Sequence, residues 1–311
     1  MAVLTDTRRP RASAHAKQKG VRTRDGWWAT FFLAPQVIGL LVFLVFPLGY
    51  AVVLAFMSWD GLNPATWVGF DNFAKQLTDA DFLRSIWNTV KLAILTVPLG
   101  LALAIAIAVG LNNIKGGNVY RVLYFLPVVT SSVAAALMWQ VILANDENGV
   151  LNTTLRNLFG ITGPDWLGDT GWVIVAIAIV TIWSSLGLNV VIFLAGLQTI
   201  PPQLMEAAKI DGAGPWRAFR SVTLPLLSPT IFFSTVVAVI SSFQAFDQIF
   251  VLVNPKNNEG ARTIVYEVYK LGFVEFKLGM SSAAALILLV LTLIVTFVQF
   301  GLQKRLVHYD A

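Results

Sequence analysis

Residues 206–225 read EAAKIDGAGPWRAFRSVTLP, a charged stretch punctuated by glycine between two long apolar segments. Just before it, Pro201–Pro202 ends one apolar segment and can open a helix, because the missing N–H of proline costs nothing in a first turn. We therefore expect a short helix over about residues 203–210. Asp211 and Gly212 predict the end of this helix, since glycine tolerates the left-handed conformation that helix ends commonly need.

A second short helix is expected to begin at Pro215, which suits a first helical turn, and to run to about Val222. Pro225 then marks the start of the next apolar segment. The predicted shape is a helix-turn-helix elbow whose first arm carries Ala207 and Ala208. These side chains are small enough to let the backbone of another protein approach closely. A plain connector between two membrane helices would have the same shape, so the residues alone leave both interpretations open.

The elbow resembles the EAA loop of permease subunits of binding-protein-dependent ABC importers. The family pattern is Glu-Ala-Ala, then Asp-Gly-Ala, then Phe and a terminal Leu-Pro. Its positions are occupied here by Glu206, Ala207, Ala208, Asp211, Gly212, Ala213, Phe219, Leu224 and Pro225, with Lys209 among them. The resemblance implies that this loop docks in a cleft on a separate ATPase subunit and transmits the motion of that subunit.

Composition excludes several classes of protein. Hydrophobic residues make up 56% of the 311 residues and charged residues only 13%, which indicates an integral membrane chain and not soluble domains. The absence of cysteine excludes disulfides, cysteine metal sites and thiol catalysis. Both histidines, His15 and His308, lie in the tails, so no imidazole serves proton relay, metal binding or a catalytic triad within the membrane. The placement of the basic residues explains the net charge of +5 better than nucleic-acid binding does.

Apolar runs long enough to cross a hydrocarbon core, which takes about 20 helical residues, recur along the chain. Lipid offers backbone groups no hydrogen-bond partner, so runs of this length indicate helices. We predict an all-α polytopic membrane protein with six transmembrane helices, at about residues 28–57, 88–111, 120–144, 172–197, 225–253 and 279–303.

Three regions follow along the chain. Residues 1–26 are polar and basic, and we expect a cytoplasmic arm that is either a solvated tail or a contact for lipid or a partner. Residues 27–304 form the six-helix permease region, with the coupling loop at 201–225. Residues 305–311 form a short cytoplasmic tail.

Lysine and arginine set the expected orientation, because they collect in cytoplasmic loops. They are frequent in the first tail, the elbow and the end of the last span, and less frequent in the opposite loops. Both termini and the elbow are therefore predicted to be cytoplasmic. The connector after the fifth span runs against the rule, although three glutamates accompany its basic residues, Lys256, Arg262, Lys270 and Lys277.

The loops on the opposite side are short, acidic and aromatic. Their carboxylates show neither the spacing of a calcium loop nor that of a converging glycosidase pair, so an enzymatic role is not indicated. We expect these loops to form part of the surface met by an extracytoplasmic binding protein, together with Trp67, Phe70, Phe73 and Trp166.

Further segments resemble the carbohydrate branch of importer permeases, in particular the first permease of maltose and glycerol-3-phosphate systems. They are WVGFDNFAKQL before the second span, Asn88–Thr89 at its start, FQAFDQIFVL in the fifth span and VYEVYKLGF after it. Where the family usually has a Gly-Gly-Pro turn, residues 254–258 read NPKNN. The resemblance covers roughly residues 28–308 and implies an importer subunit for a sugar or related polyol. Sugars, oligosaccharides, glycerol phosphate and glycerophosphodiesters all remain open as solutes.

The sequence contains no G-x-x-x-x-G-K-[ST] and therefore no phosphate-cradling loop of this type. We expect no cofactor in this chain, with ATP and Mg bound by partner subunits. The resemblance implies an assembly with a homologous second permease, two ATPase subunits and a solute-binding protein outside. An ion-coupled secondary transporter and, with less support, an integral-membrane enzyme are the alternatives.

Asp247 is the only acidic residue within a predicted span. A carboxylate near the bilayer centre costs roughly 2.5–3.5 kcal/mol, so Asp247 should face protein or water. Helical spacing predicts a polar stripe along the fifth span, made of Ser241, Gln244, Asp247, Gln248 and Val251. Neighbouring spans add Trp139, Gln140, Trp183, Ser184, Ser185 and Asn189. We predict that these residues line a path for a hydroxylated solute, with hydrogen bonding between the two permeases as the alternative.

Overall fold

The computed structural model describes residues 23–112, 124, 126–145 and 149–307. Helices dominate the described chain, which confirms the predicted all-α class. The only strands among these residues are β1 (Met57–Ser58) and β2 (Thr66–Trp67), an antiparallel pair in which Met57 lies opposite Trp67. By its contacts the chain divides into two units, Met1–Ala51 and Val52–Ala311, and each is described by itself.

The first unit is an apolar helical run of α1 (Thr23–Leu40), the π-helical turn η1 (Leu41–Val45) and most of α2 (Phe46–Ala55). Trp27–Ala55 is long and apolar enough to cross a membrane, as predicted for the first span. The π turn comes just before Pro47. Phe46 donates to the carbonyl of Leu41, five residues back, next to the position where proline interrupts the ordinary helical pattern. α1 begins inside the stretch predicted as a basic arm, of which residues 1–22 lie outside the described residues.

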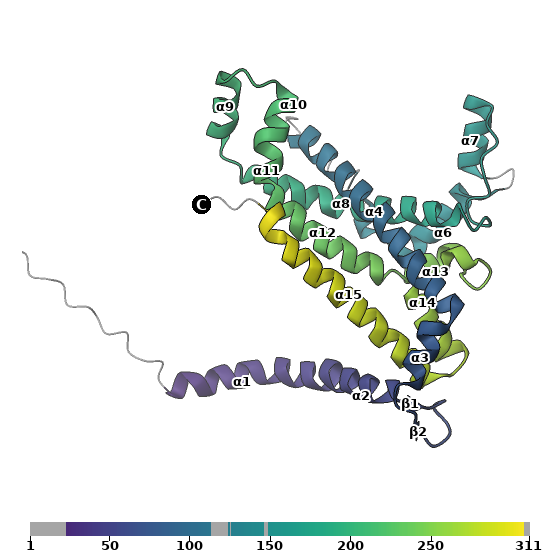
Figure 1. Ribbon diagram of the computed structural model, residues 1–311. Helices are drawn as coiled ribbons and strands as arrows, with labels where there is room; N and C mark the ends of the chain where they lie inside the picture. Colours follow the sequence, from purple (N-terminus) through teal and green to yellow (C-terminus); the bar gives the residue numbers. More distant parts are fainter. Residues whose placement is uncertain (1–22, 113–123, 125, 146–148, 308–311) are drawn as a thin grey trace, which may run out of the picture. The chain divides into compact units, whose positions relative to one another are not determined.

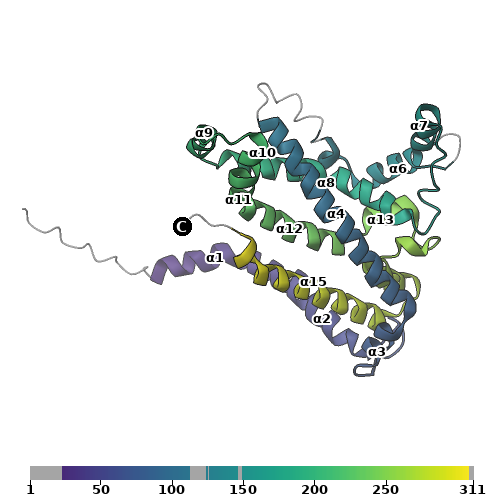
Figure 2. The ribbon, with the colours of Figure 1, turned by 45° about the horizontal axis from the view of Figure 1, so that its top comes forward.

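In the second unit, α4 (Ala80–Asn112) and α8 (Val173–Gln198) pack along each other (Figures 1 and 2). An apolar cluster joins them, and its buried members on the two helices are Val97, Leu101, Ala104, Ala108, Val190, Phe193 and Leu197. Gly187 on α8 allows close packing, because a Cβ there would collide with the carbonyl oxygen of Tyr124. Both helices are long and apolar enough to cross a membrane, as predicted for the second and fourth spans.

The third predicted span, residues 120–144, is described only in part. Residues 126–129 are helical, the helix is interrupted at Thr130–Ser131, and α6 (Ser132–Ile142) follows. The connectors carry two further short helices, α3 (Asp71–Thr78) and α7 (Val150–Phe159).

The fifth predicted span, residues 225–253, is not one helix. α12 (Ser228–Phe243) and α13 (Asp247–Val253) are separated by an irregular stretch in which Phe246 has φ −139° and ψ −64°. At its other end, α12 meets the helical segment Pro215–Leu226 at a bend of 66°. The expectation of a continuous helix is therefore wrong for this segment.

The chain closes with η3 (Glu259–Ala261), α14 (Ile264–Tyr269), η4 (Lys270–Val274) and the long apolar helix α15 (Leu278–Leu306). α15 packs on α12, where the ring centroids of Phe232 and Phe300 lie 5.5 Å apart (Figures 1 and 2). Within the described residues, four helices could each cross a membrane, and a fifth if the bent pair counts as one span. This number is compatible with six spans, because the third is described only in part.

Candidate coupling elbow and solute path

The elbow predicted over residues 201–225 is present in the structure. Its first arm is α9 (Pro202–Ile210). Its second arm is one helical segment, made of α10 (Pro215–Ala218), η2 (Phe219–Thr223) and α11 (Leu224–Leu226) (Figure 1). The hydroxyl of Thr223 contacts the sulfur of Met205 at 3.8 Å and so ties the two arms together.

The second arm extends beyond its predicted end at Val222. Pro225 lies inside its last turn, so the expectation that Pro225 marks the start of the next span is wrong. The helix accommodates this proline through a π turn, in which Leu224 donates to the carbonyl of Phe219, five residues back. The next span begins only after the break at Leu227.

Gly212 closes the first arm. Its φ of +73° lies in the left-handed region, as predicted. The N–H of Gly212 donates to the carbonyl of Lys209 at 3.1 Å, and the N–H of Ala213 donates to the carbonyl of Ala208 at 2.9 Å. These two bonds form a Schellman motif. A Cβ at Gly212 would meet no atom within 4 Å, so glycine is needed here for its backbone conformation and not for space.

The first arm presents an exposed face. Glu206, Ala207, Lys209 and Asp211 are exposed, whereas Ala208 and Ala213 are half-buried. Ile210, a residue that sequence reasoning missed, is 85% exposed. Leaving an aliphatic side chain in water is unfavourable, so Ile210 joins Ala207, three residues earlier, as a candidate contact for a partner. The available signal was a bulky apolar residue at the end of an otherwise small and charged helical turn.

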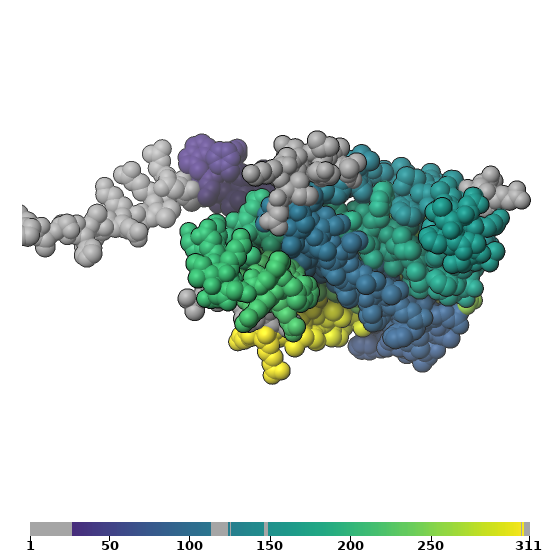
Figure 3. Space-filling view, turned by 90° about the horizontal axis from the view of Figure 1, so that it is seen from above, coloured from purple at the N-terminus to yellow at the C-terminus, as the bar shows by residue number. Residues whose placement is uncertain are grey.

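The side chain of Phe219 is not part of this exposed face. It stacks on Trp216, with ring centroids 5.6 Å apart and 30° between the planes, and it lines an apolar cavity against α4. In Figure 3 the green surface of the elbow lies against the blue surface of α4. Any contribution of Phe219 to coupling would therefore act through packing between the elbow and α4.

Several predicted path residues meet where α6, α8 and α13 pack together. Trp139 and Trp183 form a T-shaped pair with ring centroids 5.7 Å apart. The side chain of Gln248 donates to the hydroxyl of Ser184 at 2.8 Å. α13 is therefore held against α8 through a polar contact beside the two indoles.

Gln140 fastens the other end of α13. Its side-chain amide donates to the carbonyls of Val251 and Leu252, at 2.7 and 3.1 Å. The last carbonyls of a helix have no partner within that helix, so this side chain supplies one. Gln140 therefore acts as a clamp from α6 onto the C-terminal end of α13.

A second group of path residues surrounds a cavity of about 120 Å³ between α4, α8 and α12. Asn189 and Ser241 line it, and its other polar lining residues are Thr96, Thr181, Ser185 and Ser242. The hydroxyls of Thr96 and Ser242 lie 3.1 Å apart, in hydrogen-bond contact. The cavity combines hydroxyl and amide groups, which can exchange hydrogen bonds with the hydroxyls of a sugar.

Gln244 and Asp247 flank the break between α12 and α13, and both are exposed. The break overturns the single polar stripe that helical spacing predicts, because Ser241 and Asp247 lie on different helices. Asp247 occupies the first turn of α13, where free backbone N–H groups favour a carboxylate. Within a membrane-spanning region, irregular backbone is tolerated only where it is buried in protein or lines a water-filled cavity. Because the residues that flank this break are exposed, the break favours a water-lined solute path here.

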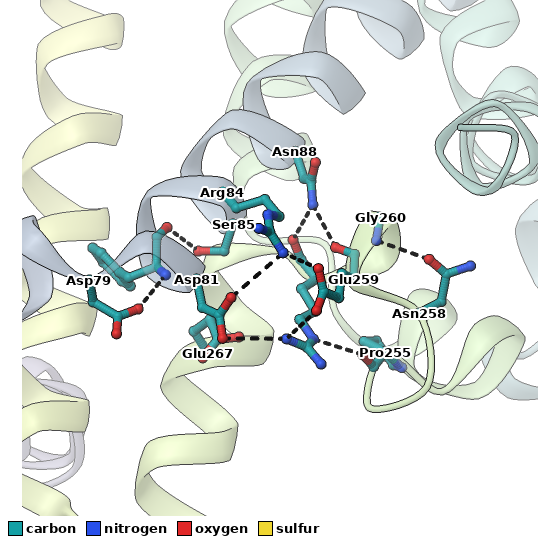
Figure 4. Close-up of polar contacts among 12 residues, drawn as sticks. Asp79, Asp81, Arg84, Ser85, Asn88, Pro255, Asn258, Glu259, Gly260 and Glu267 are labelled. Carbon is teal, nitrogen blue, oxygen red and sulfur yellow. Dashed lines mark hydrogen bonds and ion pairs between the residues drawn. The ribbon is translucent and has the colours of Figure 1, made fainter. Parts of the chain in front are cut away.

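Charged and amide side chains at the N-terminal end of α4 hold the connector that follows α13 (Figure 4). Arg84 pairs with Glu259, and Arg262 lies 3.6 Å from Asp81. The buried side chain of Asn88 donates to the carbonyls of Glu259 and Arg262, at 2.9 and 3.1 Å. These contacts fasten the connector to α4.

Asparagines build the NPKNN turn of this connector. Asn254 has φ +50°, a left-handed conformation that asparagine adopts more readily than most residues. Asn258 is buried and donates to the carbonyls of Leu167 and Gly168, at 2.9 and 3.2 Å. The turn is thus built on asparagines, without a glycine pair.

Glu267 on α14 is a buried carboxyl beside this connector. Its burial raises the pKa of Glu267, and the Lys270 ammonium, 3.1 Å from Oε2, opposes this shift only in part. Among the described residues, no group of three or more acidic, histidine or cysteine side chains could hold a metal ion.

The aromatic residues of the predicted outer surface divide into two groups. Trp67 and Phe70 are exposed and gather with Phe73 around Phe56, with ring centroids 5.2–5.7 Å from that of Phe56. Trp166 is buried, and its indole N–H donates to Asn152 at 2.7 Å. The expectation that Trp166 belongs to an exposed docking surface is therefore wrong.

A cavity of about 370 Å³ lies between the β1–β2 ribbon, α3 and the start of α15. Asp60, Asp71, Lys75 and Lys277 are its charged lining residues. Hydrogen bonds from the backbone N–H groups of Asn63 and Leu62 lower the pKa of Asp60 to about 2. Asp60 therefore lines the cavity as an ionised carboxylate over the physiological pH range.

A family model described as "Binding-protein-dependent transport system inner membrane component" matches residues 97–308. The chain is 35% identical over 309 residues to the "Probable ABC transporter permease protein YesP" of Bacillus subtilis (strain 168), an alignment that covers 96% of this chain and 97% of that protein. It is 34% identical over 285 residues to the "sn-glycerol-3-phosphate transport system permease protein UgpA" of Brucella abortus biovar 1 (strain 9-941), covering 90% and 96%.

Two solved structures share the fold over nearly the whole chain. One is a bacterial ABC transporter involved in the import of the acidic polysaccharide alginate, with a TM-score of 0.81 and 26% identity over 92% of this chain and 98% of that chain. The other is a bacterial alginate ABC transporter in complex with an alginate pentasaccharide-bound periplasmic protein, with a TM-score of 0.82, 25% identity and coverage of 93% and 98%.

Proposed function

The chain belongs to the family of binding-protein-dependent transport system inner membrane components, and we propose that it is one of two permease subunits of an ATP-driven importer for a carbohydrate or related polyol. It is a multi-pass membrane protein and a transport subunit, not an enzyme. A homologous second permease, two ATPase subunits that bind ATP and Mg, and an extracytoplasmic solute-binding protein complete the proposed assembly.

The elbow is proposed to lie on the cytoplasmic side and to dock on an ATPase subunit. Its basic residues, Lys209, Arg217 and Arg220, support this orientation. Its exposed face, with the small Ala207 and the apolar Ile210, suits insertion into a cleft of another protein. The Schellman turn at Gly212 sets the angle between this face and the second arm, so motion of the ATPase would be passed to α12 through the second arm.

The proposed solute path runs past the break between α12 and α13. Trp139, Trp183, Asn189, Gln244, Asp247 and Gln248 are its candidate lining residues. Indole faces suit the C–H surfaces of a sugar ring, while amides and the carboxylate suit its hydroxyls. Two relatives are named for transport of glycerol-3-phosphate and import of alginate, both of them hydroxylated compounds, which supports this class of solute.

The outer face is proposed to receive the solute-binding protein. The exposed rings of Trp67 and Phe70 supply apolar contacts, and the charged cavity beside the β1–β2 ribbon supplies polar ones. Aromatic residues are enriched in protein interfaces, which supports this assignment.

The observation that carries the proposal is the elbow, a charged and exposed helical hairpin that joins the apolar helix α12 at a bend of 66°. The test is uptake by vesicles that contain the chain with its second permease and ATPase subunits, using the solute that the purified binding protein retains. We expect uptake to need internal ATP and the binding protein and to proceed without an ion gradient. Uptake driven by an ion gradient alone would overturn the proposal in favour of a secondary transporter.

A further inference from the structure

An apolar cavity of about 660 Å³ lies between α4 and the second arm of the elbow, and the proposed function does not use it. Eight residues line it: Ala102, Ile105, Ala106 and Val109 from α4, and Pro215, Trp216, Phe219 and Leu224 from the elbow. The four α4 residues have the i, i+3, i+4, i+7 spacing of one helical face. Two of them are alanines, whose small side chains leave room on this face of α4.

Water is a poor occupant of this cavity, because the eight lining residues are hydrophobic. Apolar cavities bind apolar molecules, and this one is open at the protein surface, where such a molecule can enter. Trp216 is 72% exposed even though it stacks on Phe219. An apolar chain in the cavity would cover both rings and remove this unfavourable exposure.

Two basic residues are neighbours in the chain of residues that line the cavity. Arg217 follows Trp216 in the chain and Arg220 follows Phe219, and both arginines are exposed. Arg220 is four residues after Trp216, so on a helix the two lie on neighbouring positions of one side. Tryptophan is enriched where a membrane meets water, and basic residues on the cytoplasmic side attract anionic lipids. An apolar cavity lined by a tryptophan, with exposed arginines next to its lining residues in the chain, suits the acyl chain and the charged headgroup of an anionic phospholipid.

We propose that an anionic phospholipid of the bilayer binds between α4 and the elbow, with an acyl chain against Ala102 and Ala106 and its phosphate at Arg220. This inference goes beyond the proposed function, since it concerns neither the transported solute nor a protein partner. The bound lipid braces the second arm of the elbow against α4. The lipid composition of the membrane thereby acts on the element proposed to couple the permease to its ATPase.

Trp216 supplies the probe for a direct test. The assembled transporter, containing this chain, its second permease and the ATPase subunits, is placed in nanodiscs with brominated phosphatidylglycerol or brominated phosphatidylcholine. Bromine quenches tryptophan fluorescence on contact, and subtracting the signal of a Trp216→Phe variant isolates Trp216. We expect both lipids to quench Trp216, with phosphatidylglycerol preferred about fivefold, the effect of one basic residue near an anionic surface.

Two variants separate the parts of the proposal. Ala106→Phe fills the cavity and should reduce quenching by both lipids. Arg220→Gln should remove the preference for phosphatidylglycerol and keep the quenching. Lys304→Gln, at an exposed basic residue of α15 that does not line the cavity, should change neither and is the matched control. If Ala106→Phe does not assemble, the Arg220→Gln comparison decides alone.

An unquenched Trp216 in both lipids would mean that protein covers the cavity and would overturn the proposal. Equal quenching by the two lipids in the wild type would overturn the assignment of an anionic headgroup. Both results are independent of uptake, so they distinguish failure of this inference from failure of the proposed transport function.

Discussion

Gly212 sets the turn of the elbow through backbone conformation alone. Gly212→Val places a β-branched residue at φ +73°, which costs about 1–2 kcal/mol or more, so the first arm should be misaimed. We expect this variant to insert and assemble normally but to lose most of its uptake and of the ATP hydrolysis stimulated by the binding protein. Gly212→Asn is the matched control, because asparagine tolerates the left-handed region. Equal activity of the valine and asparagine variants would show that the turn conformation does not matter for coupling.

Glu267 makes stability depend on pH. Burial raises the pKa of Glu267 above its ordinary 4.5, so the folded state favours the protonated form. The stability linked to this group is therefore fully present below pH 4.5 and is lost as the pH rises through the raised pKa. Glu267→Gln removes the ionisation, while Lys270 keeps Glu275 at 3.8 Å as a partner.

The variant should melt at a higher temperature than the wild type at about pH 8, with a difference that shrinks toward acid pH. Thermal unfolding of the purified chain at several pH values measures this. A difference that stays constant with pH would contradict titration of Glu267 in this range.

The start of α13 and the break before it should be accessible to water. The chain has no native cysteine, so single cysteines can be placed at Gln244, Asp247 and Ile249. Gln244 and Asp247 are exposed, whereas Ile249 is 2% exposed and serves as the control. We expect aqueous thiol reagents to label the first two positions and not the third, and solute or trapped nucleotide states to protect the labelled positions. Inert cysteines at 244 and 247 in every state of the transport cycle would place the path elsewhere.

The clamp by Gln140 can be tested on the same element. Gln140→Leu leaves the carbonyls of Val251 and Leu252 without this donor, an effect of about 1–3 kcal/mol for buried groups. α13 should then open more often, and labelling of a cysteine at Ile249 should accelerate. Ser184→Ala removes one polar contact of α13 and should give a smaller acceleration. Unchanged labelling in the Gln140→Leu background would show that packing alone holds α13.

Across the whole molecule, buried amides should matter more than the surface ion pairs that accompany them. Arg84 and Glu259 have side chains 46% and 53% exposed, and exposed pairs contribute about 0–1 kcal/mol. Asn88 is 4% exposed and bonds two carbonyls of a connector that lies far away in the sequence. We expect Asn88→Leu to lower the free energy of unfolding by about 1–3 kcal/mol and Arg84→Ala by less. Denaturant titration of the solubilised chain would contradict this order if Arg84→Ala were the more damaging change.

The sequence by itself determined the class of protein, most of the long helices and the position of the elbow. Each of these follows from local physics, because lipid imposes helices on long apolar runs and proline and glycine start and stop short helices wherever they occur. The conformation of Gly212 follows for the same reason, since a helix end that needs a left-handed residue is a local requirement. Ile210 shows the limit of this reasoning, because its exposure depends on what the rest of the chain leaves uncovered.

Only the tertiary structure decided where the fifth span breaks, how Phe219 faces and that Trp166 is buried. Helical spacing places residues on one face only while the helix continues, and the helix between Phe243 and Asp247 does not. Side chains from other helices, Gln140 and Ser184 among them, take part in holding α13 in place, and their positions are set by packing between segments distant in the chain. The candidate path therefore depends on contacts that no local pattern contains, whereas the elbow is specified by its own residues.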